Sequence, residues 1–408
     1  MTAAPLEIQF FHHKSDKWID YIREYSDVAT LEAAGTISVT RGSLPGANND
    51  ASFAQLPEAL RRLLFFGKPD VVICLDDGIR PVRPIFALDV TEHVSAADHW
   101  MQRFPNLVGC AQEGVPGAFV TPGDMPARAN FVSAKQPNFY FLFDRVIEIH
   151  QTPLYIAEWP SSDGKGLDGD AKYHDLPPHG SEGMAHTLNF LNLVLERAVK
   201  GQDFRSLMRE RLVINLRSSL RAQGYRKLPQ IGDFGRLKAN MPDNRMLSGP
   251  EMSSWLADRS LGLPSPLPER ISKRESYLIF APRIQKESSD DRREAMLKRI
   301  AEKGGDPYGP QPLVFDYMFC RLGPSKLERD SNVVIDLSFL EFSDFAEWIQ
   351  KIWVNSPVGS TSYDEVASKM AVYSLHLTEP LIQVVKNFVR WQIFAADLIV
   401  FKDGVIAF

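Results

Sequence analysis

Residues 68–93, KPDVVICLDDGIRPVRPIFALDVTEH, constrain the fold more than any other stretch of the sequence. Two short apolar runs, VVICL and IFALDV, flank the turn-forming residues Asp76-Asp77-Gly78, and this pattern predicts a β-hairpin. Asp70 opens the first strand and Asp89 closes the second. Because facing residues on adjacent strands lie within about 5.5 Å of each other, the hairpin is expected to place two carboxylates side by side.

The segments around the hairpin predict both helices and further strands. Residues 52–66 carry apolar side chains at helical spacing, and residues 95–104, SAADHWMQRF, are typical of a helix with a capping box. Residues 114–122, GVPGAFVTP, predict a turn and a buried strand. The order helix, strand, strand, helix, strand predicts an α/β or α+β protein.

The rest of the chain divides into larger regions. Residues 144–150 and 152–159 predict strands, residues 161–183 an exposed loop, and residues 184–200 a long helix. From residue 276 onward, strand-like and helical segments follow one another. We therefore expect three parts: a domain at 1–125, a mixed region with the long helix and a basic segment at 126–275, and a C-terminal α/β region at 276–408.

The charge distribution favours one basic segment in an otherwise acidic chain. The 408 residues carry a formal net charge of −5, which argues against a wholly basic nucleic-acid binder. Between residues 197 and 245, however, basic residues clearly outnumber acidic ones. This segment either runs along phosphates or forms a solvated helix surface. The candidate nucleic-acid contacts are Arg205, Arg209, Arg217, Arg221, Arg226 and Lys227.

The sequence indicates a cytoplasmic protein with no membrane partner. It contains no run of about 18 apolar residues, and its N-terminus lacks the basic start and apolar stretch of a signal peptide. Cys74, Cys110 and Cys320 lie in apolar surroundings and have no metal-binding spacing. Such cysteines suit a reducing compartment.

The acidic pair of the hairpin predicts a divalent metal site. Mg²⁺ prefers oxygen ligands and is usually bound by one or two carboxylates, with water and substrate phosphate completing its shell. Asp70 and Asp89 supply two such ligands, and Glu58, on the preceding helix, is a candidate third. The expected cofactor is Mg²⁺ or Mn²⁺.

These residues resemble the motifs of the PD-(D/E)XK nuclease superfamily, which includes many type II restriction endonucleases. The resemblance covers roughly residues 50–125. It lies in Glu58, Pro69-Asp70, Asp89-Val90-Thr91 and Gln102 on the following helix. It implies a mixed sheet flanked by helices, with Asp70 and Asp89 as the metal-binding acids, Glu58 as the helix glutamate and Gln102 as the helix polar residue. It also implies Mg²⁺-dependent hydrolysis of DNA phosphodiester bonds, in restriction or phage defence.

The sequence departs from the motif at its lysine position, which holds Thr91. If the strand stays regular, Glu92 points to the opposite face, whereas His93 shares the face of Asp89 and could act as a base near neutral pH.

Two other functions stay open. One is a nuclease-like protein without activity that binds DNA or assembles with a partner. The other is a metal-independent enzyme with a small-molecule site around the loop at 160–183. For a nuclease, a homodimer is an expected assembly, because cutting both strands commonly takes two sites related by symmetry.

Overall fold

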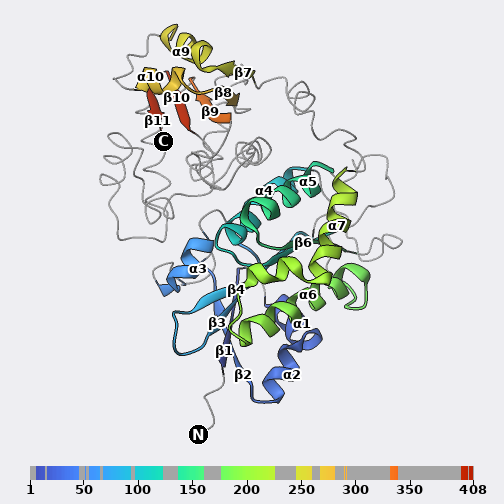
Figure 1. Cartoon of the computed structure of the whole chain (residues 1–408). Coiled ribbons are helices and arrows are strands. Elements are labelled where there is room, and N and C mark those ends of the chain that lie inside the picture. The colour runs from blue at the N-terminus through green and yellow to red at the C-terminus, as the bar shows by residue number, and fades with distance from the viewer. Residues whose placement is uncertain are drawn as a thin grey trace. The chain divides into compact units, whose positions relative to one another are not determined.

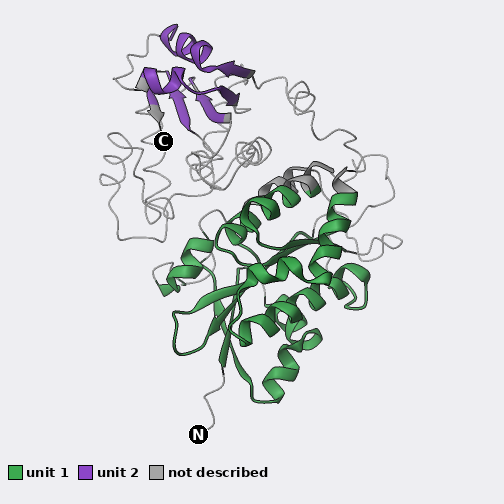
Figure 2. Cartoon of the chain, in the orientation of Figure 1, with its two compact units in different colours: residues 1–229 green, residues 230–408 purple. Residues whose placement is uncertain are grey.

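The chain forms two compact units, residues 1–229 and residues 230–408 (Figure 2). A computed structural model describes residues 6–13, 16–45, 51, 55–64, 68–92, 97–122, 137–159, 176–225, 245–259, 267–280, 289, 291, 331–338, 397–402 and 404–407. Each unit has a sheet and a hydrophobic core of its own. The α/β fold class expected from the sequence is confirmed.

Unit 1 is built on a six-stranded mixed sheet with the strand order β2-β1-β3-β4-β5-β6. Strand β3 is antiparallel to both of its neighbours, whereas β1 and β2 are parallel, and β4, β5 and β6 run parallel to one another. The strands are β1 (Leu6–His12), β2 (Ile37–Ser43), β3 (Val71–Asp76), β4 (Arg83–Val90), β5 (Gly117–Pro122) and β6 (Leu154–Trp159).

The predicted hairpin is formed by β3 and β4. In its turn, the side chains of Asp76 and Asp77 accept backbone N–H bonds, and Gly78 has φ +66°, a conformation that glycine adopts without strain. Val71 pairs with Leu88, a register that places Asp70 opposite Asp89. A one-residue bulge interrupts the pairing nearer the turn, at Ile85.

Helices cover both faces of this sheet (Figure 1). Helices α1 (Lys17–Tyr25), α2 (Asp27–Ala33) and α6 (Glu182–Val199) share one core with apolar residues of the strands. Helices α4 (Ala97–Gln112) and α5 (Pro137–His150) lie on the face that Asp89 points to, with ring contacts among Phe104, Phe119 and Phe143. Short helix α3 (Glu58–Leu63), the 3-10 segment η2 (Phe204–Arg209) and helix α7 (Arg211–Tyr225) complete the unit.

Two sequence predictions for this unit are wrong. The strand expected at 144–150 is the second half of α5, because Phe143, Val146 and Ile147 are buried at helical spacing. The domain boundary expected at residue 125 would divide the sheet, since β5 pairs with β6 across it. The contacts of the chain place the division at residues 229 and 230 instead.

Unit 2 contains a five-stranded sheet with the order β11-β10-β9-β8-β7. Strands β8, β9 and β10 are parallel, and both edge strands are antiparallel to their neighbours. Its elements are β7 (Arg245–Ser248), α9 (Gly249–Ala257), α10 (Leu267–Ser272), β8 (Ser276–Phe280), β9 (Ser331–Leu337), β10 (Leu398–Phe401) and β11 (Val405–Ala407). Among the described residues of the chain, no helix is long and apolar enough to cross a membrane.

Candidate functional site

The hairpin brings Asp70 and Asp89 together at its open end, as the sequence predicts. Asp89 is completely buried, and Asp70 is 9% exposed. The backbone N–H of Val90 donates to Oδ2 of Asp70, with 2.9 Å between nitrogen and oxygen. This bond ties the first carboxylate to the strand that carries the second one.

Helix α4 supplies two partners that the sequence analysis did not identify. Nη1 of Arg103 lies 3.3 Å from Oδ2 of Asp70 and 2.9 Å from Oδ1 of Asp89. Nδ2 of Asn106 lies 2.8 Å from Oδ2 of Asp89 and 3.3 Å from the carbonyl oxygen of Lys68. Residues three apart share one face of a helix, and this spacing was the only signal in the sequence that could have paired them.

The electrostatics of the pair follow from burial. Burial raises the pKa of the Asp89 carboxyl, and the charge of Asp70 raises it further, against the opposing effects of Arg103 and Asn106. Burial lowers the pKa of Arg103, but the facing carboxylates outweigh this effect and the net pKa is raised. The guanidinium is therefore charged at any physiological pH, and it is the positive group of the site.

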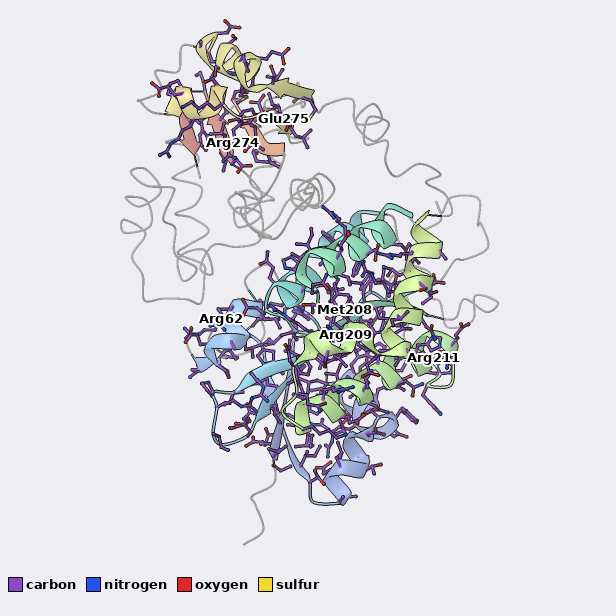
Figure 3. The ribbon with its side chains drawn as sticks, in the orientation of Figure 1. Arg62, Met208, Arg209, Arg211, Arg274 and Glu275 are labelled. Atoms are coloured by element: carbon purple, nitrogen blue, oxygen red, sulfur yellow. The ribbon has the colours of Figure 1, made fainter. Side chains whose placement is uncertain are left out.

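The structure does not bring Glu58 to this pair. Its side chain is 75% exposed, and its Oε1 lies 3.1 Å from Nη1 of Arg62, one turn further along α3. Figure 3 labels Arg62. Across the described part of the chain, no group of three or more acidic, histidine or cysteine residues could hold a metal ion. The prediction of Glu58 as a third metal ligand is therefore not supported by the geometry.

The residues around the missing lysine are only partly described. Thr91 is buried, and its backbone N–H donates to the carbonyl of Val120. Glu92 lies beyond the end of β4 and forms an ion pair with Lys17 at the start of α1. His93 lies outside the described residues, and so does the side chain of Gln102, although its backbone belongs to α4.

The basic segment contains two kinds of arginine. Arg217 and Arg221, on α7, bind the buried carboxylate of Asp144 on α5, with nitrogen–oxygen distances of 2.6 and 2.7 Å. Arg205 and Arg209, on η2, are exposed (Figure 3 labels Arg209). Arg226 and Lys227 lie outside the described residues. Two of the predicted DNA contacts thus have a clear structural role in holding α7 against α5.

The donor chemistry of the pair fits a divalent cation. Two carboxylate oxygens, one from each aspartate, already converge on a single positively charged nitrogen. Mg²⁺ commonly takes one or two carboxylates and leaves its other positions to water and phosphate oxygens. Asp70 and Asp89 are the described residues that could hold such an ion.

Comparison with known proteins gives no relative, since no protein family, curated protein or solved structure matches this chain. What the protein does must therefore be inferred from its own residues.

Proposed function

We propose that this protein is a Mg²⁺- or Mn²⁺-dependent endonuclease that hydrolyses phosphodiester bonds in DNA. The observation that carries the proposal is the convergence of Asp70 and Asp89 on one cationic group at the open end of the hairpin. Mg²⁺ is commonly held by one or two carboxylates, and a phosphodiester hydrolase uses such an ion to activate water and to neutralise charge on the phosphate.

The residues of the chain prepare the two acids. The N–H of Val90 fixes Asp70 by a bond to one of its oxygens, and the amide of Asn106 fixes Asp89 in the same way. Such outer partners orient metal-binding carboxylates. A bound divalent ion would neutralise charge on the phosphate and activate water.

The fold around the pair supports the proposal. Helix α3, the hairpin β3-β4, helix α4 and strand β5 follow in the order expected for a PD-(D/E)XK nuclease, within a mixed sheet that has helices on both faces. Asp70 precedes β3 and Asp89 lies near the end of β4, the positions that the resemblance assigns to the two acids. A role in restriction or phage defence follows from this resemblance alone.

The exposed arginines of η2 are the proposed DNA contacts outside the site. Arg205 and Arg209 are exposed cations, and such side chains supply sequence-independent affinity for phosphates. The sequence also predicts Arg226 and Lys227 as DNA contacts and His93 as the general base, and the proposal retains these roles. A homodimer would allow both strands of a duplex to be cut.

One observation favours a second function, a nuclease-like protein that binds DNA or a partner without cutting. Arg103 and Asn106 already satisfy both oxygens of Asp89, and Thr91 offers no charge at the lysine position. A carboxylate whose two oxygens are both hydrogen-bonded within the protein also suits a nuclease-like fold that has lost its activity. Only a cleavage measurement separates the two functions.

The test is cleavage of mixed plasmid and phage DNA by the full chain with Mg²⁺, Mn²⁺ or EDTA. The wild type should cut with either metal and not with EDTA, and Asp70→Asn should abolish cutting. Glu58→Gln is the matched control, because it removes an acid of the predicted motif that the structure places in solvent. Its cutting should equal that of the wild type. A folded wild type that cuts nothing with either metal would overturn the nuclease proposal.

A further inference from the structure

We infer that Arg103 is a further catalytic residue, which contacts the substrate phosphate through the guanidinium nitrogens that the two aspartates leave unused. The inference rests on the proposed function, because it concerns the same site. It assigns to a helix residue the cationic role that the sequence motif gives to a strand lysine, at the position where this chain has Thr91.

The first support is the way the guanidinium is shared. Both carboxylates are contacted through one nitrogen, Nη1. Within the described part of the chain, Nε and Nη2 of Arg103 form no hydrogen bond. A guanidinium carries five N–H donors in a planar fork, and it binds phosphate oxygens in pairs. Arg103 therefore has donors left for an anion while it still holds the acids.

The second support is exposure at the site itself. The side chain of Arg103 is 21% exposed, whereas that of Asp89 is fully buried. Solvent therefore reaches part of the Arg103 side chain and part of Asp70, which is 12% exposed, but not Asp89.

The third support comes from the neighbouring cations, which are engaged elsewhere. Nζ of Lys68 donates to the carbonyl of Pro45, and Lys17 is paired with Glu92. Among the described residues, Arg103 is the one cationic side chain that contacts both acids.

The balance of charge makes the contact depend on a divalent cation. Two carboxylates and one guanidinium sum to −1 when both acids are ionised, and this charge repels a phosphate. Added divalent charge reverses the sign. The contribution of Arg103 to DNA affinity should therefore be present with a divalent cation and absent without one.

The experiment measures DNA binding rather than cleavage. The probe is a fluorescein-labelled DNA duplex, and its anisotropy is followed with the full chain in Ca²⁺ or in EDTA. Ca²⁺ binds oxygen ligands as Mg²⁺ does, with looser geometry. In Ca²⁺, Arg103→Met should weaken binding about ten- to a hundredfold, the range expected for a hydrogen bond to a charged group. Arg103→Lys should lie in between, because an ammonium cannot bind in a bidentate manner. In EDTA the three proteins should bind alike.

Arg62→Met is the matched control. Arg62 also bridges two carboxylates, those of Glu58 and Glu113, but it lies on α3 (Figure 3). This variant should bind DNA as the wild type does in both conditions. In Ca²⁺, the slope of log affinity against log salt concentration should become shallower in Arg103→Met by the amount expected for about one phosphate contact. It should stay unchanged in Arg62→Met.

Equal affinity of the wild type and a folded Arg103→Met in Ca²⁺ would overturn the inference and leave Arg103 as a partner of the acids only. If Arg103→Met does not fold, Arg103→Lys decides, since unchanged affinity overturns the inference and weakened affinity supports it. The nuclease proposal is judged separately. A wild type that cuts no DNA, but whose Ca²⁺-supported binding depends on Arg103, would refute the nuclease and keep the phosphate contact.

Discussion

At the scale of single residues, the site shows how a buried carboxylate acquires partners from a distant element. Asp89 has no exposed surface, so each of its oxygens must be satisfied within the protein. Arg103 and Asn106 satisfy one oxygen each. The side-by-side placement of Asp70 and Asp89 could be predicted from the hairpin alone. The partners on α4 could not, because they depend on how the helix packs on the sheet.

Asn106→Leu should destabilise the protein, because it removes the bonds of Asn106 to Asp89 and to the carbonyl of Lys68. The free energy of unfolding should fall by about 1–3 kcal/mol, the cost of leaving buried polar groups unsatisfied. Urea denaturation measures the change. Asn215→Leu, on the exposed side of α7, is the control and should shift stability by less than about 0.5 kcal/mol. Equal stability of Asn106→Leu and the wild type would contradict this account of Asp89.

A titration prediction concerns His150, at the end of α5. Burial lowers the pKa of His150 to about 4, below its unfolded value of about 6.5. Below about pH 6.5, His150 binds a proton in the unfolded chain but stays neutral in the folded chain. The contribution of His150 to the free energy of unfolding should therefore be fully present above about pH 6.5 and should be lost as the pH falls toward about 4.

His150→Gln tests this sign. The urea midpoint of the wild type should drop between about pH 7 and about pH 4.5, and the drop should be smaller in the variant. Because each protein is compared with itself at the two pH values, any effect of the substitution that does not depend on pH cancels. The same drop in both proteins would show that His150 does not carry this acid sensitivity.

At the scale of elements, the junction of α6 with β6 is one of close backbone approach. A Cβ atom at Gly183 would lie 2.7 Å from the carbonyl oxygen of Glu158 and 3.0 Å from its nitrogen. These atoms belong to a strand and cannot turn aside as a side chain can. The helix packs this closely on the sheet because residue 183 has no side chain.

Gly183→Ala should lower the free energy of unfolding by about 1–3 kcal/mol, the usual cost of overpacking. Gly180→Ala is the matched control, because a Cβ atom there meets nothing within 4 Å. Urea denaturation of both variants gives the comparison. If Gly183→Ala is no less stable than Gly180→Ala, then α6 can shift away from β6 at little cost.

The elements also show which sequence patterns are reliable. The hairpin is predicted well because the apolar runs and the turn residues between them agree over residues 70–89. The segment 144–150 alternates like a strand when read alone, and its helical spacing is visible only from Phe143 onward. Helix α4 extends to Gln112, past Pro105, beyond the end expected at residue 104. A prediction from a short sequence segment is therefore unreliable where the segment belongs to a longer helix.

At the scale of the whole molecule, each unit has the parts of an independent domain. Unit 1 contains a complete six-stranded sheet and its own core, and so a fragment of residues 1–229 should fold alone. Circular dichroism and urea denaturation should give one cooperative transition.

A fragment of residues 1–125 is the control, because it ends where the sequence suggested a boundary but lacks β6, α5 and α6. It should give no cooperative transition. The division at residue 229 would be refuted if the 1–229 fragment were unfolded. If the 1–125 fragment folded, the other strands of the sheet would not need β6 for their stability. The sequence could not reveal this division, because β5 pairs with β6 across residues 123–153, and the boundary expected at residue 125 falls inside that segment.

The bulge at Ile85 separates two parts of the hairpin. It lies between the turn and the acidic end, and the pairs Val71–Leu88, Val72–Ala87 and Ile73–Phe86 beyond it keep Asp70 opposite Asp89. Ile79, in the turn, is 91% exposed and adds little to the core. An insertion or deletion in the exposed turn should therefore change the length of the hairpin while Val71 stays paired with Leu88, so that Asp70 and Asp89 remain side by side.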